Sequence, residues 1–365
     1  MNHSHPRVRT AGTSAPRRRT ATKAKRTATL LVAAFAGLFY PAAVGPAHAR
    51  NHGSGGHSIN GRIVLIREDD QGNDSAYTIA PDGAGEHLVS PGDWAHWSPN
   101  GREIGVHSAD GVPVTIVTVA TGAARDLPTP DPDFVCGPTT TEEQCAQTDF
   151  SCPIWTPNGR RLTCTGSSGV NPSKDGIYTL RASDGGDNRL LRRCPPVCDE
   201  VLGEYSPSGR RLLLNMPDAD GVLRIYTIKS DGSDLTAITP PSMLINEDYG
   251  GSWSRSNRIL FAARPAPDHR FALWSVKPDG SDLRQLPVPD CGGALDDPDS
   301  VGCPNGDWSP DGREIVFSRV TATGEAVYTV NLHTLAVARV SPNGAFEFFP
   351  YWGVASPHRG RSLAN

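Results

Sequence analysis

Four clusters of carboxylates are the residues of this chain best suited to binding a ligand. They comprise Asp131, Asp133, Glu142, Glu143 and Asp149; Asp199, Glu200 and Glu204; Glu247 and Asp248; and Asp290, Asp296, Asp297 and Asp299. Carboxylates gathered on one surface attract a cationic partner. Ca²⁺ needs about six to eight converging oxygens, of which the cluster from Asp290 to Asp299 could supply three or four. The alternative is that these charges only keep an exported protein soluble.

The eight cysteines predict a set of disulfides. All of them follow residue 49, and an even number of cysteines in an exported chain is typical of a disulfide framework. Their clustering favours the pairs Cys136–Cys145, Cys152–Cys164, Cys194–Cys198 and Cys291–Cys303. Zinc is disfavoured, because no C-x-x-C or H-x-x-H partner completes a set at ligand spacing. All but Cys152 and Cys164 lie among the carboxylate clusters, where a loop ordered by a disulfide would lose less entropy on binding.

Catalytic motifs are nearly absent from the sequence. The segment 166–170 is the nearest match to G-x-S-x-G and lacks the final glycine, and no P-loop, H-E-x-x-H or dinucleotide fingerprint occurs. His96 and His107 flank one turn on two strands that we expect to pair, so they could lie close together and bind a divalent ion. The alternative places both histidines on the surface or between sheets, because no third ligand accompanies them.

A repeat identifies the elements that must position these residues. Its first signature is an aromatic residue, then Ser or Thr, Pro, any residue, Gly and Arg, followed by an apolar strand. It occurs at 97–102, 155–160, 205–210 and 308–313, with a divergent copy at 253–258 and a sixth aromatic residue at Trp352. Successive aromatic anchors are 58, 50, 48, 55 and 44 residues apart. Such a period is typical of propellers and other repeat architectures.

A second signature alternates with the first. It is a β-rich run that ends in a polar or Asp-Gly turn, as at 225–232 and 273–280. Pro and Gly supply the backbone angles that tight hairpin turns need, so each repeat predicts two hairpins, or four strands. One such sheet cannot bury both faces alone, whereas six sheets around an axis bury them against each other. The sequence therefore predicts an all-β fold, a six-bladed β-propeller of four-stranded antiparallel blades over residues 59–352.

The two ends of the repeat region together complete one blade. The strand at 61–66 resembles the one after Gly312-Arg313 but has no aromatic anchor before it, and Trp352 has an anchor but little chain after it. We expect the ring to close by pairing of the N-terminal strand with the Trp352 strand, which would cover exposed sheet edges. The competing closing strand is the segment 356–363.

These signatures resemble the WD40-like "PD40" repeats of the TolB-type β-propeller family over about residues 59–352. The resemblance implies the fold far more strongly than the function. Members of the family bind proteins in the periplasm or gate an attached peptidase. We expect neither the N-terminal α/β domain of TolB nor a C-terminal hydrolase domain in this chain, so the partners of TolB are not carried over.

Residues 1–49 read as a cleaved signal peptide. They contain eight basic and no acidic residues, an apolar stretch from Leu30 to Val44, and a small-x-small cleavage site at 47–49. Residues 50–58 are then a flexible N-terminal segment and 353–365 a C-terminal tail. Without the leader, 27 basic residues face 39 acidic ones, a net charge of −12 that disfavours nucleic acid and anionic lipid as partners.

The predicted function is that of a secreted, monomeric and non-enzymatic binding module. The segments before the aromatic anchors should connect the outer strand of one blade to the inner strand of the next, so the carboxylates and most cysteines gather at one mouth of the channel. This face would hold a protein, peptide or glycan, without a cofactor unless Ca²⁺ binds there. The alternative is a metal-assisted lyase or hydrolase with its site in the central channel.

Overall fold

The computed structural model describes residues 59–107, 114–194, 201–297, 299–321, 324–341 and 346–356. The chain divides into two units, Met1–Gly56 and His57–Asn365, and the described residues all belong to the second. The predicted signal peptide and the flexible segment 50–58 lie outside them. No helix among the described residues is long and apolar enough to cross a membrane.

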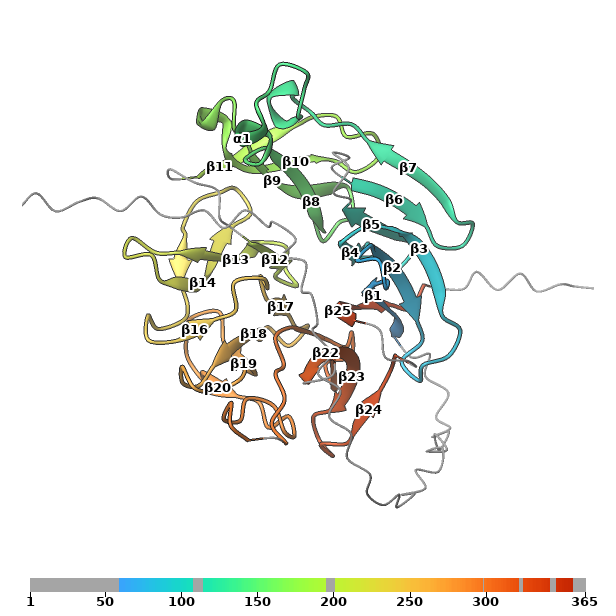
Figure 1. Ribbon diagram of the computed structural model, residues 1–365, viewed down its shortest axis with the longest axis vertical. Helices are drawn as coiled ribbons and strands as arrows, with labels where there is room; N and C mark the ends of the chain where they lie inside the picture. Colours follow the sequence, from blue (N-terminus) through green and yellow to red (C-terminus); the bar gives the residue numbers. More distant parts are fainter. Residues whose placement is uncertain are drawn as a thin grey trace, which may run out of the picture. The chain divides into compact units, whose positions relative to one another are not determined.

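Six antiparallel sheets surround a central axis, as Figure 1 shows, which confirms the predicted six-bladed propeller. The first sheet contains β25 (Phe346–Val354), β1 (Asn60–Glu68), β2 (Asp74–Ile79) and β3 (His87–Pro91). The second contains β4 (Trp94–Trp97), β5 (Glu103–His107), β6 (Val114–Thr118) and β7 (Ala123–Leu127). The third contains β8 (Asp149–Trp155), β9 (Arg161–Ser167), β10 (Gly176–Arg181) and β11 (Arg189–Arg193).

The other three sheets follow the same order from the axis outward. The fourth contains β12 (Val201–Tyr205), β13 (Arg211–Pro217), β14 (Leu223–Lys229) and β15 (Thr236–Ala237). The fifth contains β16 (Leu244–Ile245) and β17 (Ser252–Trp253), both paired with β18 (Ile259–Arg264), then β19 (Ala272–Val276) and β20 (Arg284–Gln285). The sixth contains β21 (Gly306–Trp308), β22 (Glu314–Thr321), β23 (Gly324–Asn331) and β24 (Val337–Arg339). Short helices occur at η1 (Pro132–Phe134), α1 (Glu142–Cys145) and η2 (Pro172–Lys174).

The turn between the first two strands of a blade explains the first signature. In the second blade, the Ser98 hydroxyl accepts a hydrogen bond from the N–H of Glu103 at 2.9 Å, and Gly101 has φ +66°. A positive φ is costly for residues with a side chain, except Asn and Asp, which tolerate it better. The divergent fifth copy places Asn257 at this position, with φ +61°. The loss of the Pro-x-Gly sequence there leaves the turn intact.

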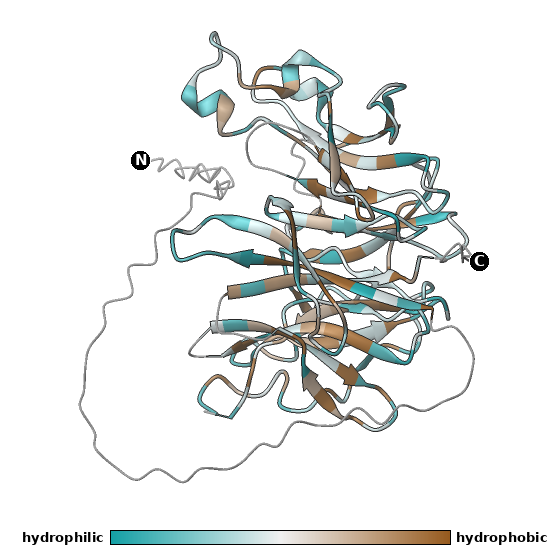
Figure 2. Ribbon diagram, turned by 90° about the vertical axis from the view of Figure 1, so that its right-hand side faces the viewer, coloured by the Kyte–Doolittle hydropathy of each residue, from teal (hydrophilic) through white to brown (hydrophobic). Residues whose placement is uncertain are grey.

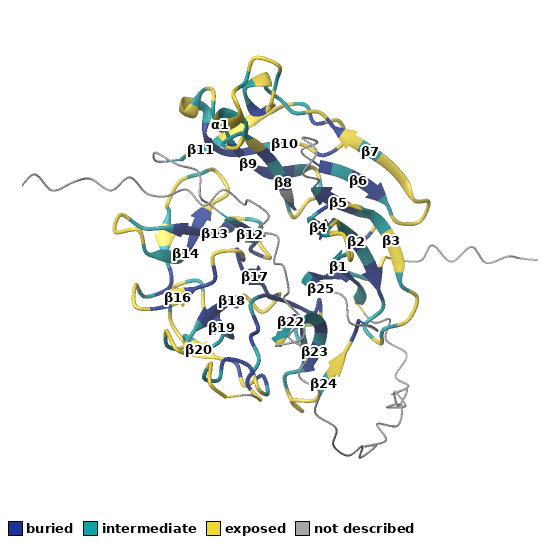
Figure 3. Cartoon of the chain, viewed as in Figure 1, coloured by how far each residue is buried: buried dark blue, intermediate teal, exposed yellow. Residues whose placement is uncertain are grey.

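The aromatic anchors fill the spaces between the sheets. All six anchors, Trp97, Trp155, Tyr205, Trp253, Trp308 and Trp352, are buried. Figure 3 shows the buried residues along the inner and middle strands and the exposed ones mainly on loops and outer strands. Figure 2 shows the matching hydropathy, with apolar residues on the strands and hydrophilic ones in the loops. Burial of a large aromatic side chain contributes several kcal/mol, so the anchors hold the ring together.

The ring closes through the N-terminal strand, as predicted. β1 pairs with β25 in antiparallel register, with Ile63 opposite Trp352 and Val64 opposite Tyr351. An ion pair reinforces the closure, because Arg67 lies 2.6 Å from both the buried Glu347 on β25 and Glu86. From residue 357 onward, the competing segment lies outside the described residues.

Candidate functional site

Most of the predicted carboxylates that the structure describes lie at one end of the sheets. Strands alternate in direction within each blade, so the loops after the fourth strand and those after the second emerge at the same end, opposite the Ser-Pro turns. We call this end the loop face, defined by the loops 128–148, 168–175, 265–271 and 286–305. The opposite end, with the Ser-Pro and Asp-Gly turns, is the turn face.

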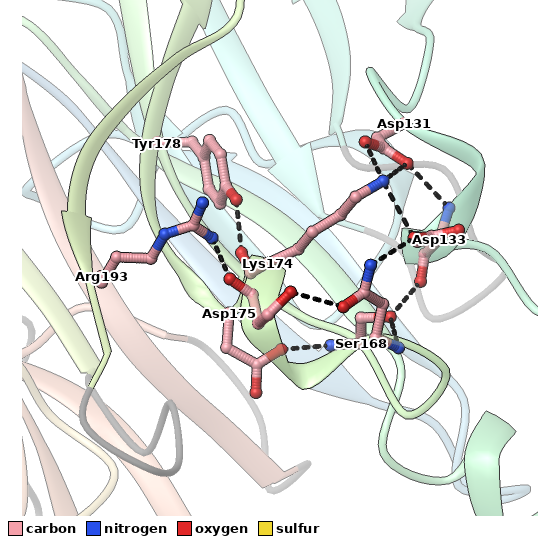
Figure 4. A network of polar contacts seen from close by, with 9 residues as sticks. Asp131, Asp133, Ser168, Lys174, Asp175, Tyr178 and Arg193 are labelled. Carbon is pink, nitrogen blue, oxygen red and sulfur yellow. Dashed lines mark hydrogen bonds and ion pairs between the residues drawn. The ribbon is translucent and has the colours of Figure 1, made fainter.

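Loop 128–148 is fixed to the neighbouring loop 168–175 by a polar network (Figure 4). The Nζ of Lys174 lies 2.6 Å from Asp131 Oδ2 and 2.9 Å from Asp133 Oδ2. Ser168 Oγ donates to the carbonyl of Asp133 at 2.7 Å. The hydrogen bonds from Lys174 lower the pKa of Asp133. Asp131 and Asp133 therefore help to order the loop, and their predicted role in ligand binding stays a prediction.

The same loop also carries two exposed acidic side chains. Glu142 and Glu143 are exposed in the first turn of α1. A capping box at Thr141 and Gln144 satisfies the N-terminal N–H groups of this short helix, and Cys145 forms the predicted disulfide with Cys136. The carboxylates of Glu142 and Glu143 are thus held on an ordered loop.

Loop 286–305 is closed by the predicted disulfide Cys291–Cys303, both ends of which are buried. Isolated bridges join Cys291 to Val301 and His269 to Ala294, so the loop is also tied to the loop 265–271. Its predicted carboxylates, Asp290, Asp296, Asp297 and Asp299, are exposed. Asp290 lies 3.5 Å from Arg319, and Asp297 accepts a hydrogen bond from the N–H of Asp299.

The described residues contain no group of three or more His, Cys, Asp or Glu side chains arranged to hold a metal ion. Ca²⁺ binding by Asp290, Asp296, Asp297 and Asp299 stays a prediction that this arrangement does not strengthen. The metal-assisted active site around His96 and His107 likewise stays an alternative prediction.

The remaining predictions fall partly outside the described residues. Glu247 and Asp248 are exposed, but their segment 246–251 interrupts the inner strand of the fifth blade, between β16 and β17, and does not connect two blades as predicted. Asp199, Glu200 and Cys198 lie outside the described residues, and Cys194 is disulfide-bonded. The disulfide Cys152–Cys164 is present and buried, and it joins β8 to β9.

The structure also reveals a polar cluster on the inner strands. Its residues precede the aromatic anchors and are His96, Glu204, Ser252, Asp307 and Tyr351, with the apolar Ile154 at the sixth position. Glu204, which we predicted in an acidic loop, lies instead within β12, and we did not predict the cluster as a whole. Glu204 Oε1 lies 3.7 Å from His96 Nε2, and the rings of His96 and Tyr351 are 4.1 Å apart. The signal was the recurrence of polar residues at this one position of an otherwise apolar inner strand.

Each axial carboxylate bonds to the next sheet. Glu204 accepts the N–H of Trp253 at 2.9 Å, and Asp307 accepts the N–H of Trp352 at 2.7 Å. Burial raises the pKa of Asp307 to about 7 and, together with the charge of Asp307, raises that of Glu204. Burial lowers the pKa of His96 to about 4. Tyr249 and Tyr351 are buried around them, and the backbone bonds of Glu204 and Asp307 make this cluster a connection between blades.

His107 makes a separate set of contacts. Its Nδ1 lies 2.8 Å from Asp93, and its Nε2 lies 3.8 Å from Asp149 at the start of β8. Burial opposes the charged ring, but Asp149 and Asp93 outweigh burial and raise the pKa of His107 to about 9. His107 is therefore an inter-blade cation, in agreement with the alternative interpretation of the two histidines.

Comparisons with known proteins support the fold alone. No protein-family model matches the chain, and no curated protein matches it. TolB from Acinetobacter baumannii is similar in structure, with a TM-score of 0.60 and 14% identity over 81% of this chain and 67% of that one. A chain of the nidogen/laminin complex has a TM-score of 0.57 and 10% identity over 81% of this chain and 98% of its own length. Putative TolB from Agrobacterium tumefaciens gives a TM-score of 0.53 and 18% identity over 82% of this chain and 99% of that one.

These neighbours are TolB-like and other β-propeller proteins. At such low identity they leave the membership in the PD40 repeat family a prediction.

Proposed function

We propose that this chain is an exported, non-enzymatic binding module that recognises a protein, peptide or glycan through its loop face. The observation that carries the proposal is the construction of two long loops, 128–148 and 286–305. Each loop is closed by a disulfide and bonded to a neighbouring loop, and each keeps exposed carboxylates. An ordered loop loses less conformational entropy when a ligand binds. Extra order in long acidic loops is hard to explain by solubility alone.

The charge on this face favours a cationic partner surface. Exposed carboxylates lie on two loops of this face, at Glu142, Glu143, Asp290, Asp296, Asp297 and Asp299. Complementary charge accelerates association and fixes orientation more than it adds affinity. Binding should therefore weaken as the salt concentration rises.

The comparisons and the cysteines agree with this proposal. One chain of similar fold comes from the structure of a complex between nidogen and laminin, which supports a protein partner here. Three disulfides among the described residues fit an extracellular protein. The basic and apolar leader at residues 1–49 would direct the chain out of the cell, and the mature protein would act as a monomer.

The test is a pull-down from spent culture medium with the mature protein. The loop-face variant carries Glu142→Gln, Glu143→Gln, Asp296→Asn and Asp297→Asn. A matched control carries Asp82→Asn, Asp184→Asn, Asp231→Asn and Asp279→Asn on the turn face, where Asn keeps the oxygen that caps each turn. We expect a partner retained by the wild type and the control and lost by the loop-face variant. Equal retention by all three proteins would refute the role of the loop face.

A further inference from the structure

A cavity opens between the third and fourth blades on the turn face. Its volume is about 480 Å³, which is within the range of small-molecule sites. One wall is formed by the apolar side chains of Pro157, Leu190, Leu191 and the ring of Tyr205. The other wall carries polar groups, including Asn158 and Arg189. We call this cavity the inter-blade pocket.

The hydrogen-bond acceptors of the polar wall are already used. Arg161 donates hydrogen bonds to the hydroxyl of Thr179 at 3.1 Å and to its backbone carbonyl at 2.7 Å. The side-chain oxygen of Asn158 accepts from the Thr156 hydroxyl and from the N–H of Arg160, both at 2.9 Å. These bonds leave the pocket few acceptors to offer a ligand.

Hydrogen-bond donors remain. Within the described part of the chain, the amide nitrogen of Asn158 has no partner. Arg189 contacts only Asp187, through Nε at 3.0 Å and Nη2 at 2.7 Å, which leaves Nη1 for another group. Arg161 and Arg189 share the single carboxylate of Asp187, so the pocket has a net charge of +1. This charge lies in a chain whose predicted mature form carries −12.

We propose that the inter-blade pocket binds a small organic anion. Its oxyanion head, a phosphate, sulfate or carboxylate, would lie against Arg189 and the amide of Asn158. Its compact ring or apolar body would pack against Leu190, Leu191 and Tyr205. The hydrogen-bond donors and the apolar side chains together define the class of ligand. The site lies at the opposite end of the sheets from the loop face.

The fifth blade contains a matching set of ion pairs beside a shorter outer strand. There Asp282, with φ +52°, lies 2.6 Å from Arg258 and 3.9 Å from Arg284, just as Asp187, with φ +53°, joins Arg161 and Arg189. The outer strand β20 has only two residues, whereas β11 has five and carries Leu190 and Leu191. The longer outer strand supplies the apolar wall that the ion pairs lack.

The test is isothermal titration calorimetry of the mature protein with three probes. Phenyl phosphate carries the head and the body, inorganic phosphate the head alone, and phenol the body alone. We expect phenyl phosphate to bind at least 10-fold more tightly than either fragment. Arg189→Gln should weaken it at least 10-fold, whereas the matched Arg284→Gln should leave it unchanged.

Three outcomes would overturn the pocket proposal. They are no binding of phenyl phosphate, phenol binding as tightly as phenyl phosphate, or equal losses in the two Arg→Gln variants. Titrations with benzoate and with phenyl sulfate then show whether the pocket prefers a carboxylate, a sulfate or a phosphate group. Because these probes do not involve the loop face, failure here leaves the proposed function standing, and the reverse also holds.

Discussion

At the scale of single residues, the axis of the propeller is the least expected part of the molecule. Two carboxylates, Glu204 and Asp307, are brought together where burial disfavours their charged forms. Each carboxylate accepts a hydrogen bond from a backbone N–H of the next blade, which offsets part of the cost of its burial. The cluster therefore lowers the stability of the protein at high pH but fixes the contacts between neighbouring inner strands.

The first prediction concerns Asp307→Asn. The pKa of Asp307 is raised from 3.8 to about 7, so the unfolded chain releases this proton more readily, and the stability of the wild type is lost as pH rises from about 4 to about 7. Asn cannot ionise and keeps an oxygen for the N–H of Trp352. We expect the variant to be more stable than the wild type by about 2 kcal/mol at pH 8, with no gain at pH 4.

Urea unfolding of both proteins at the two pH values measures this difference. The variant Asp297→Asn, at an exposed position, serves as the control, and its free energy of unfolding should differ from that of the wild type by the same small amount at both pH values. A loss of stability in Asp307→Asn at pH 8 would mean that the ionised carboxylate is favourable where it lies.

At the scale of elements, the disulfides belong to two classes. Cys152–Cys164 joins two neighbouring strands within one blade, whereas Cys136–Cys145 and Cys291–Cys303 close loops that leave the sheets. A cross-link that closes a loop acts mainly on the freedom of that loop and of the unfolded chain. The strands of the sixth blade keep their own pairing and their Trp308 anchor without it.

The second prediction is that replacing Cys291 and Cys303 together by Ser leaves the propeller folded. The free energy of unfolding should fall by about 2–3 kcal/mol, because the closed loop spans 12 residues. Hydrogen exchange should rise within 286–305 and stay unchanged in β22 and β23. Loss of the far-ultraviolet strand signal in this variant would instead assign the disulfide to the scaffold.

At the scale of the whole molecule, the sequence predicts the ring better than it predicts the site. The six anchors and their turns specify the blades locally, and the apolar run of 61–66 indicates the closing strand. The roles of Asp131 and Asp133 were not predictable, because their partner Lys174 lies in a different loop and no local pattern connects them. The axial cluster and the inter-blade pocket likewise depend on which blades become neighbours.

The divergent fifth repeat also shows how far the sequence of one turn predicts its structure. Its signature lacks the Pro-x-Gly sequence, yet Asn257 adopts the backbone angle that glycine has elsewhere, and Ser254 keeps the same turn bond. The sequence of a single turn understates its stability when the neighbouring sheets determine the path of the chain.

Hydrogen exchange of the mature protein, alone and with the partner retained in the pull-down, tests most directly the claim that recognition occurs on the loop face. We predict that the partner slows exchange in 128–148 and 286–305 and leaves the turns 206–210 and 277–283 unchanged. Protection confined to those turns, with both disulfide-closed loops exchanging as before, would contradict the claim.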